Sequence, residues 1–172
     1  MITTTTPTTG ATRILIVDDN PEIHADFRKV LGTGDPGGGD LAALEADLFG
    51  GGGAAATTAT APAFEIDSAL QGKDALEMVR GAVTTGRPYT LAFVDVRMPP
   101  GWDGVETVRR IREVTAAMSF VICTAYSDYT PEQAREQTGI RDGMLFITKP
   151  FDVGLVRRLA ESARRLAQPR AA

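Results

Sequence analysis

The stretch Leu91-Ala-Phe-Val-Asp-Val-Arg-Met-Pro-Pro-Gly-Trp-Asp-Gly104 decides how the rest of the chain is interpreted. Its first four residues are apolar and predict a buried strand that ends at the carboxylate of Asp95. Pro99, Pro100 and two glycines prevent this strand from continuing and predict a loop. Open α/β sheets bind ligands at the carboxyl ends of their strands, so Asp95 is the first candidate for chemistry. Taken alone, Asp95 could also be a strand-end residue that caps a turn.

Size and composition describe an ordinary globular chain. The 172 residues include 43% hydrophobic and 23% charged residues, and the net charge of −4 does not favour nucleic acid or an anionic membrane. No apolar run approaches the ~18 residues of a membrane span, and residues 1–12 lack the features of a signal peptide. One cysteine and one histidine exclude an internal disulfide and argue against zinc. We therefore expect a cytoplasmic protein without direct contacts to nucleic acid or membrane.

Strand and helix patterns alternate along the chain. Further strands are expected at 13–17, 64–68, 118–123 and 144–147, and helices at 21–31, 71–83, 103–114, from near 131, and 151–167. This alternation predicts an α/β fold: a doubly wound, five-stranded parallel sheet of order 2-1-3-4-5, of the flavodoxin-like type. The switch point of that order lies between the first and third strands. It would bring Asp18, Asp19 and Asp95 together.

Residues 32–63 have a different composition, with two glycine runs and a stretch of Ala and Thr that are typical of a linker. Residues 40–49 within it could form a short helix. So short a segment cannot build a core of its own. We therefore expect an insertion in one domain of residues 13–168, between a flexible leader at 1–12 and a tail at 169–172.

The predicted strand ends carry complementary polar groups: Asp18-Asp19, Asp95, Thr124 and Lys149. Two unit charges ~4 Å apart repel by about 4 kcal/mol at an effective dielectric near 20, so three clustered carboxylates need compensation. Oxygen ligands without His or Cys favour Mg²⁺, with Mn²⁺ as an alternative. A cation, the Lys149 ammonium and the Thr124 hydroxyl together suit a transferring phosphoryl group, for which an aspartate can be the nucleophile.

These residues resemble the receiver domain of two-component response regulators. The matching motifs are Ile14-Leu-Ile-Val-Asp-Asp19, Val94-Asp-Val-Arg-Met-Pro99 with Asp103-Gly104, Thr124-Ala125 and Lys149-Pro-Phe151. The resemblance implies a phosphoacceptor that takes a phosphoryl group from a histidine kinase or phosphotransfer protein. The protein is not expected to be an enzyme; at most it would phosphorylate itself from small donors and slowly lose the phosphate. Its partner would be a downstream protein or a covalently linked output domain.

The resemblance assigns the site residues by position. Asp95 would be the phosphoacceptor, and Lys149 would form an ion pair with the phosphorylated side chain. Asp18, Asp19 and Asp95, with the backbone carbonyl of Arg97, would be the protein's Mg²⁺ ligands. The Lys149–Pro150 peptide bond is expected to be cis, as in other members of the family.

Other positions have roles that the sequence leaves open. Thr124 and Phe146 would form a switch in which the hydroxyl moves to the phosphate and the aromatic ring changes rotamer, although both could simply pack at strand ends. Arg97 and Tyr126 occupy positions that control water access in the family, which predicts slow loss of phosphate. Trp102 is expected to be exposed beside the site, as a partner contact or lid, or else to pack on its own loop.

Several alternatives remain. The insertion resembles a receiver subtype found at the start of sensor kinases, so the chain could be the receiver portion of a larger hybrid sensor kinase or signalling protein. An aspartate-nucleophile phosphatase would need an acid/base aspartate where Arg97 stands. A flavin module would need a phosphate-binding loop where Asp18 and Asp19 stand. A degenerate receiver is disfavoured because every site position is filled.

His24, on the first predicted helix, is expected to be solvated.

Overall fold

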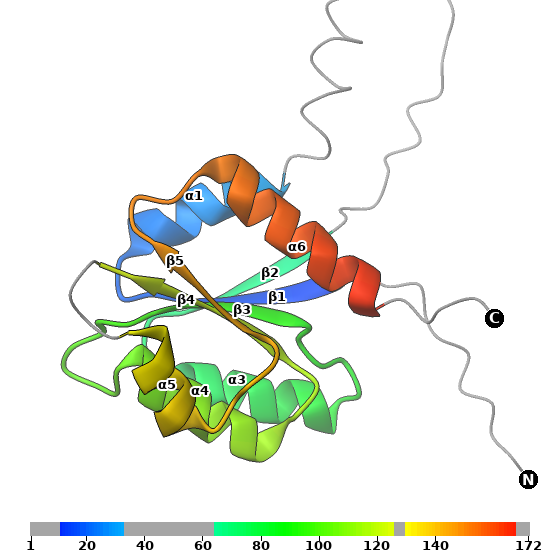
Figure 1. Ribbon diagram of the computed structural model, residues 1–172. Helices are drawn as coiled ribbons and strands as arrows, with labels where there is room; N and C mark the ends of the chain where they lie inside the picture. Colours follow the sequence, from blue (N-terminus) through cyan, green and yellow to red (C-terminus); the bar gives the residue numbers. More distant parts are fainter. Residues whose placement is uncertain (1–10, 33–63, 126–129, 168–172) are drawn as a thin grey trace, which may run out of the picture.

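One parallel sheet organises the part of the chain that the computed structural model describes, residues 11–32, 64–125 and 130–167. Its strand order is β2-β1-β3-β4-β5, as the sequence predicts. The strands are β1 (Thr12–Val17), β2 (Phe64–Ala69), β3 (Leu91–Asp95), β4 (Ser119–Thr124) and β5 (Met144–Thr148). All neighbouring pairs are parallel, so their carboxyl ends meet at one edge of the sheet (Figure 1).

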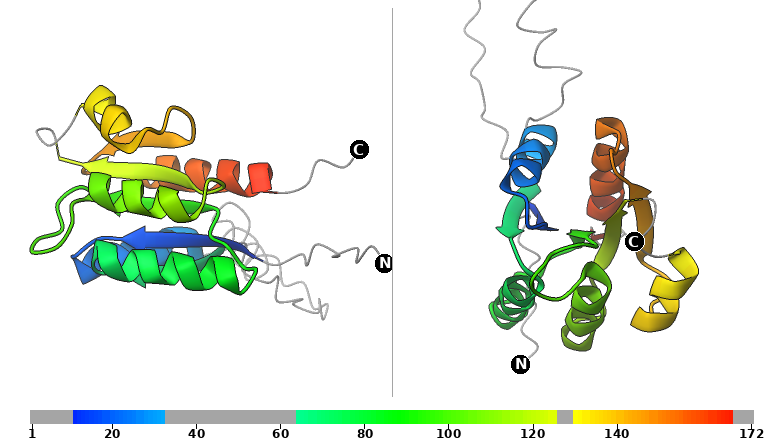
Figure 2. Two further views of the ribbon diagram at one scale, coloured as in Figure 1. Left: turned by 90° about the horizontal axis from the view of Figure 1, so that it is seen from below. Right: turned by 90° about the vertical axis from the view of Figure 1, so that its left-hand side faces the viewer.

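Within the described ranges, five helices cover the two faces of this sheet. They are α1 (Pro21–Gly32), α3 (Gly72–Thr84), α4 (Gly104–Val114), α5 (Pro131–Thr138) and α6 (Val153–Ala167). Helices α1 and α6 lie on one face, and α3, α4 and α5 lie on the other, which gives three layers (Figure 2). This is the doubly wound α/β arrangement, in which the exposed loops at the carboxyl ends of the strands form the ligand-binding edge.

Alternate residues of each central strand enter two separate cores. Ile14 and Ile16 of β1 pack beneath α1 and α6, whereas Leu15 and Val17 pack toward α3, α4 and α5. All four side chains are at most 1% exposed. Burial on both faces explains why these strands are continuous apolar runs rather than alternating ones.

Side-chain caps mark where four of the helices begin. At α6, Asp152 accepts a hydrogen bond from the Leu155 N–H at 2.9 Å. Asn20 accepts a hydrogen bond from the Glu22 N–H at 3.0 Å, just before Pro21 opens α1. Asp103 caps α4 by accepting from the Glu106 N–H at 2.8 Å. Thr130 and the third residue of α5 form a reciprocal capping box. Asn20 lies three residues after the end of β1 and Asp103 lies eight residues after the end of β3, so each of these caps closes the loop that follows its strand.

The last helix differs from its prediction. It begins at Val153 rather than Phe151, and its buried residues are Val156, Ala160 and Ala163. The helical spacing of its apolar residues also predicts that Leu166 is buried, but this side chain is 82% exposed. Ala160 and Ala163 join the core on the α1 and α6 side of the sheet, and the stripe of buried residues ends before Leu166.

Some sequence predictions concern residues outside the described part of the chain. They concern the insertion beyond Gly32, Tyr126, the tail at 169–172 and most of the leader. Thr12, the last residue of the predicted leader, is described and begins β1. The domain boundaries therefore remain predictions. Among the helices of the described ranges, none has the length and apolar character needed to cross a membrane.

Candidate functional site

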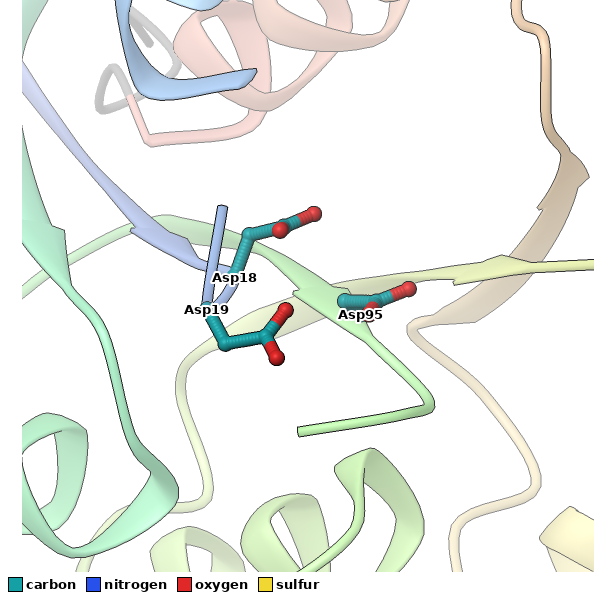
Figure 3. Close-up of side chains that lie close together, drawn as sticks. All are labelled: Asp18, Asp19 and Asp95. Atoms are coloured by element: carbon teal, nitrogen blue, oxygen red, sulfur yellow. The ribbon is translucent and has the colours of Figure 1, made fainter. Parts of the chain in front are cut away.

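Three carboxylates converge at the carboxyl edge of the sheet. Val17 of β1 pairs with Val94 of β3, so Asp18 and Asp95 each follow one member of this pair. One oxygen from each of Asp18, Asp19 and Asp95 lies within 4.8 Å of the others. Figure 3 shows the three side chains grouped at the ends of β1 and β3. The switch point between these strands therefore assembles the acidic cluster as the sequence predicts.

Lys149 directly follows the edge strand β5, and its side chain reaches this cluster. Its Nζ donates to Asp18 Oδ2 at 2.8 Å and lies 2.9 Å from Asp95 Oδ1. The Lys149 N–H also donates to the Thr124 carbonyl at 2.9 Å, which fixes the start of the loop after β5. The Lys149–Pro150 peptide bond is cis, as predicted. One ammonium thus bridges the ends of β1 and β3.

The site holds more negative than positive charge. Burial raises the pKa of Asp95; Lys149 offsets part of this effect through a hydrogen bond and its charge, and Asp18 and Asp19 raise the pKa further. Burial alone would lower the pKa of Lys149, but its hydrogen bonds and attraction to Asp18 and Asp95 raise it. At a separation near 4.8 Å two carboxylates still repel by about 3 kcal/mol at an effective dielectric of 20. In the protein alone, the negative charge of this cluster is therefore only partly neutralised.

The donor atoms fit a hard divalent cation. The cluster offers oxygen ligands alone, from one buried aspartate, Asp18, one exposed aspartate, Asp19, and Asp95, which is 9% exposed. Oxygen ligands of this kind favour Mg²⁺ or Mn²⁺ over zinc. Arg97 lies exposed in the following loop. The role of its backbone carbonyl as a ligand stays a prediction.

The loop after β3 is closely packed against the backbone of Asp95. Gly104 donates its N–H to the Val96 carbonyl at 2.9 Å. A Cβ atom at Gly104 would collide with the backbone carbonyl of Asp95, so only glycine allows this approach. The Asp103-Gly104 pair therefore has two local functions: the aspartate caps α4, and the glycine lets α4 begin against the strand that carries Asp95.

The two proposed switch residues lie on neighbouring strands. Thr124 ends β4, pairs with Thr148 of β5, and donates its hydroxyl to the Ala125 carbonyl at 2.7 Å. Phe146 of β5 is half-buried against the core, with the Arg135 guanidinium of α5 5.9 Å from the ring centre. Thr124 lies at the same end of the sheet as Asp95, whereas Phe146 lies in the middle of β5, opposite Ile122. The structure does not test the movement of either residue.

Trp102 is not exposed, although one of its two predicted arrangements required exposure. It is half-buried and packs against the core on the α3 and α4 side. The Arg110 guanidinium lies 4.2 Å from the ring centre, and the Lys73 ammonium lies 5.7 Å from it. Two cations from neighbouring helices therefore contact the indole. The sequence showed the indole in the loop but not the cations that α3 and α4 bring to it.

His24 is another residue that the sequence interpretation placed wrongly. It is only 3% exposed, although it was expected to be solvated. Its Nε2 lies 2.7 Å from the backbone carbonyl oxygen of Asp18. The helical spacing of His24 with Phe27 and Leu31, which form the buried face of α1 with it, could have indicated its burial. Its backbone partner is not visible in the sequence.

The comparisons with known proteins agree with this geometry. The model of the response regulator receiver domain matches residues 54–161. This range contains Asp95, Thr124 and Lys149, whereas Asp18 and Asp19 precede it. The match spans well over half of the chain, which shows membership in the family.

Two curated relatives are similar to parts of the chain. Sporulation initiation phosphotransferase F of Bacillus subtilis is 29% identical over 94 residues, which are 55% of this chain and 68% of that protein. Response regulator protein PilR of Pseudomonas aeruginosa is 32% identical over 84 residues, 49% of this chain but only 18% of PilR. The chain therefore spans a small part of the second relative.

A solved structure supports the fold. The chemotaxis protein CheY4 of Vibrio cholerae has a TM-score of 0.60 at 18% identity, over 90% of this chain and 99% of that one. At this identity the likeness concerns the fold alone. Together with the family match and the acidic cluster at the switch point, it identifies the chain as a member of the response regulator receiver domain family, the phosphoaccepting domains of two-component signalling.

Proposed function

We propose that Asp95 is the phosphoacceptor of this receiver domain and that its phosphorylation depends on Mg²⁺. The observation that carries the proposal is the Lys149 ammonium within 2.9 Å of Asp95 in a cluster that also contains Asp18 and Asp19. Asp95 stands at the end of β3, where it can be reached from the ligand-binding edge of the sheet.

The chemistry is an in-line transfer to a carboxylate. A carboxylate oxygen of Asp95 attacks the phosphorus of a phosphohistidine or a small acyl phosphate and forms an acyl phosphate. The bond from phosphorus to the donor nitrogen or oxygen breaks, and the electron pair stays with the leaving imidazole or carboxylate. The Asp95 carboxylate must be ionised to act as the nucleophile, and the adjacent Lys149 ammonium favours the ionised form.

The acidic residues around Asp95 suit a metal-assisted reaction. When bound, Mg²⁺ would neutralise charge on the phosphoryl oxygens, and Asp18, Asp19 and Asp95 are the side chains that would hold it. Lys149 reaches both Asp18 and Asp95, so it is placed to contact a phosphoryl group on Asp95. Neither the charge of Mg²⁺ nor that of the Lys149 ammonium would alone offset three carboxylates and an incoming phosphate.

The response to phosphorylation would begin at Thr124. Its hydroxyl donates to the Ala125 carbonyl, so contact with a phosphoryl oxygen requires exchange of one acceptor for another. Such an exchange costs little, because the net value of one hydrogen bond is about 1 kcal/mol. Phe146 on the neighbouring strand would respond to this movement and alter the surface formed by α5 and β5.

The partners follow from this chemistry. The donor would be a histidine kinase or phosphotransfer protein, and the recipient a downstream protein or a linked output domain. PilR is much longer than the segment that it shares with this chain, which makes a receiver within a larger signalling protein a specific alternative. Both alternatives use the same Asp95 chemistry.

Intact-mass measurement after incubation with Mg²⁺ and acetyl phosphate tests the proposal. We expect one phosphoryl adduct on the wild type, none on Asp95→Asn, and none when a chelator is present. Asp19→Asn should retain the acceptor but give much less adduct, because it removes a candidate metal ligand. Asp74→Asn, at an exposed position of α3, serves as the matched control and should behave like the wild type.

Each outcome has a defined meaning. An adduct on Asp95→Asn would show that another residue is the acceptor. An adduct that persists in chelator would contradict the metal dependence. Sustained turnover of a phosphate ester without a stable adduct would favour a phosphatase instead.

A further inference from the structure

His24 of α1 is buried beneath the acidic pair. The side chain is 3% exposed, and its Nε2 is 2.7 Å from the Asp18 carbonyl oxygen. A carbonyl oxygen can only accept a hydrogen bond, so Nε2 carries the hydrogen and donates it. The imidazole thus contacts the backbone, and not the carboxylate, of a candidate metal ligand.

With this hydrogen bond, each backbone and side-chain polar group of Asp18 has a hydrogen-bond partner. The Asp18 N–H donates to the Ala69 carbonyl at 3.2 Å. Its Oδ1 accepts from the Asn20 N–H at 2.9 Å, and its Oδ2 accepts from Lys149 at 2.8 Å. The carbonyl is the remaining polar group of Asp18, and it begins the peptide unit that leads to Asp19. Rotation of that unit would change where the Asp19 carboxylate points.

Packing alone does not explain a histidine here. Its other ring nitrogen, Nδ1, is buried and has no hydrogen-bond partner among the described residues. A buried polar atom without a partner costs free energy, so an apolar side chain of similar size would fill this space at lower cost. What the imidazole adds is the Nε2–H donor aimed at Asp18.

We propose that His24 is a positioning residue, which fixes the peptide plane between Asp18 and Asp19 and thereby preorganises the acidic pair for a divalent cation. The inference rests on the proposed Mg²⁺-dependent function. Partners that orient the ligands of a metal typically change its affinity by about 10–100-fold when removed. Without the donor, the Asp18 carbonyl would be left unsatisfied or would rotate toward another donor, and Asp19 would move with it.

Two substitutions separate positioning from packing. His24→Leu keeps the approximate volume but removes the donor, whereas His24→Gln can place an amide N–H near the position of Nε2. Leu31→Ala, on the same buried face of α1 and two turns further along, is the matched control that damages packing alone. For each variant we would measure the Mg²⁺ dissociation constant by calorimetry and the free energy of unfolding in chelator.

We expect His24→Leu to weaken Mg²⁺ binding about tenfold, His24→Gln to stay within about threefold of the wild type, and Leu31→Ala to lose stability without loss of affinity. If His24→Leu fails to fold, His24→Asn replaces it, because its shorter amide corresponds to Nδ1 and cannot reach the carbonyl. Folded donor-free variants that bind Mg²⁺ as the wild type does would overturn the role of His24. A wild type that binds no Mg²⁺ would overturn the proposed function itself.

Discussion

The two ends of the sheet are both rich in charge, but they balance it differently. Near the amino ends of β1, β2 and β3, five side chains form the amino-end cluster: Arg13, Glu65, Asp67, Arg87 and Tyr89. Two arginines face two carboxylates there. Arg13 pairs with both acids and contacts the Tyr89 ring, and the Tyr89 hydroxyl donates to Asp67 at 2.7 Å.

The carboxyl end lacks this balance. Among the described residues, Asp18 and Asp95 pair with the ammonium of Lys149, and the pKa of Asp95 is raised by burial and by its acidic neighbours despite that ammonium. The comparison indicates that side chains at the amino end neutralise one another's charges. At the carboxyl end, negative charge is left for a ligand to neutralise. Stability should therefore depend on the amino end, and metal binding on the carboxyl end.

The largest expected effect is at Arg13, whose side chain is 16% exposed. We expect Arg13→Met to lower the free energy of unfolding by about 2 kcal/mol, between the values for buried and exposed ion pairs. Urea unfolding followed by circular dichroism measures it. Arg80→Met, which breaks the exposed pair with Glu77, should cost less than about 0.5 kcal/mol. Equal losses would contradict a special role for the amino-end cluster.

The next effect concerns alkaline pH. Burial, and then the hydrogen bond and charge of Asp67, raise the pKa of Tyr89 above its ordinary value of 10.0. Above that pH the unfolded chain loses the phenol proton while the folded chain keeps it, so stability is complete below pH 10 and falls as pH rises. The slope is up to about 1.4 kcal/mol per pH unit. Tyr89→Phe should remove this component from the pH dependence of unfolding; identical curves would show that Tyr89 does not titrate differently in the two states.

The smallest effect has the opposite sign. Without divalent cations, Asp95→Asn should raise the free energy of unfolding by on the order of 1 kcal/mol, because the cost of burying a charged carboxylate, together with its repulsion by Asp18 and Asp19, exceeds the lost pairing with Lys149. Added Mg²⁺ should stabilise the wild type more than the variant. Thermal unfolding with and without Mg²⁺ would show it. A variant that is less stable in chelator would mean that the carboxyl end is balanced after all.

The sequence predicted the sheet well because burial on both faces leaves continuous apolar runs. The runs that end at Val17, Asp95 and Cys123 became β1, β3 and β4 with boundaries within about one residue, within the usual uncertainty of such limits. Parallel order then placed Asp18, Asp19 and Asp95 together without any further information. The site could be predicted because its side chains lie at strand ends.

The contacts that the sequence could not predict depend on backbone atoms and on neighbouring helices. His24 is a polar residue on a buried face, and only the fold shows that the Asp18 carbonyl is its partner. Trp102 meets cations from α3 and α4, which lie apart in the sequence. Leu166 continues the apolar pattern of α6 beyond the point where the core ends. Periodicity identifies which side of a helix is apolar but not how far its neighbours extend.

The position of Trp102 has a practical consequence for optical measurements. It is the single tryptophan of the chain and lies in the loop that follows Asp95. Because indole emission responds to nearby charge, the contacts with Arg110 and Lys73 make its intensity and wavelength sensitive to small shifts between α3 and α4. The protein therefore contains an intrinsic fluorophore in the loop that follows Asp95, and movements of this loop can be followed in real time without a label.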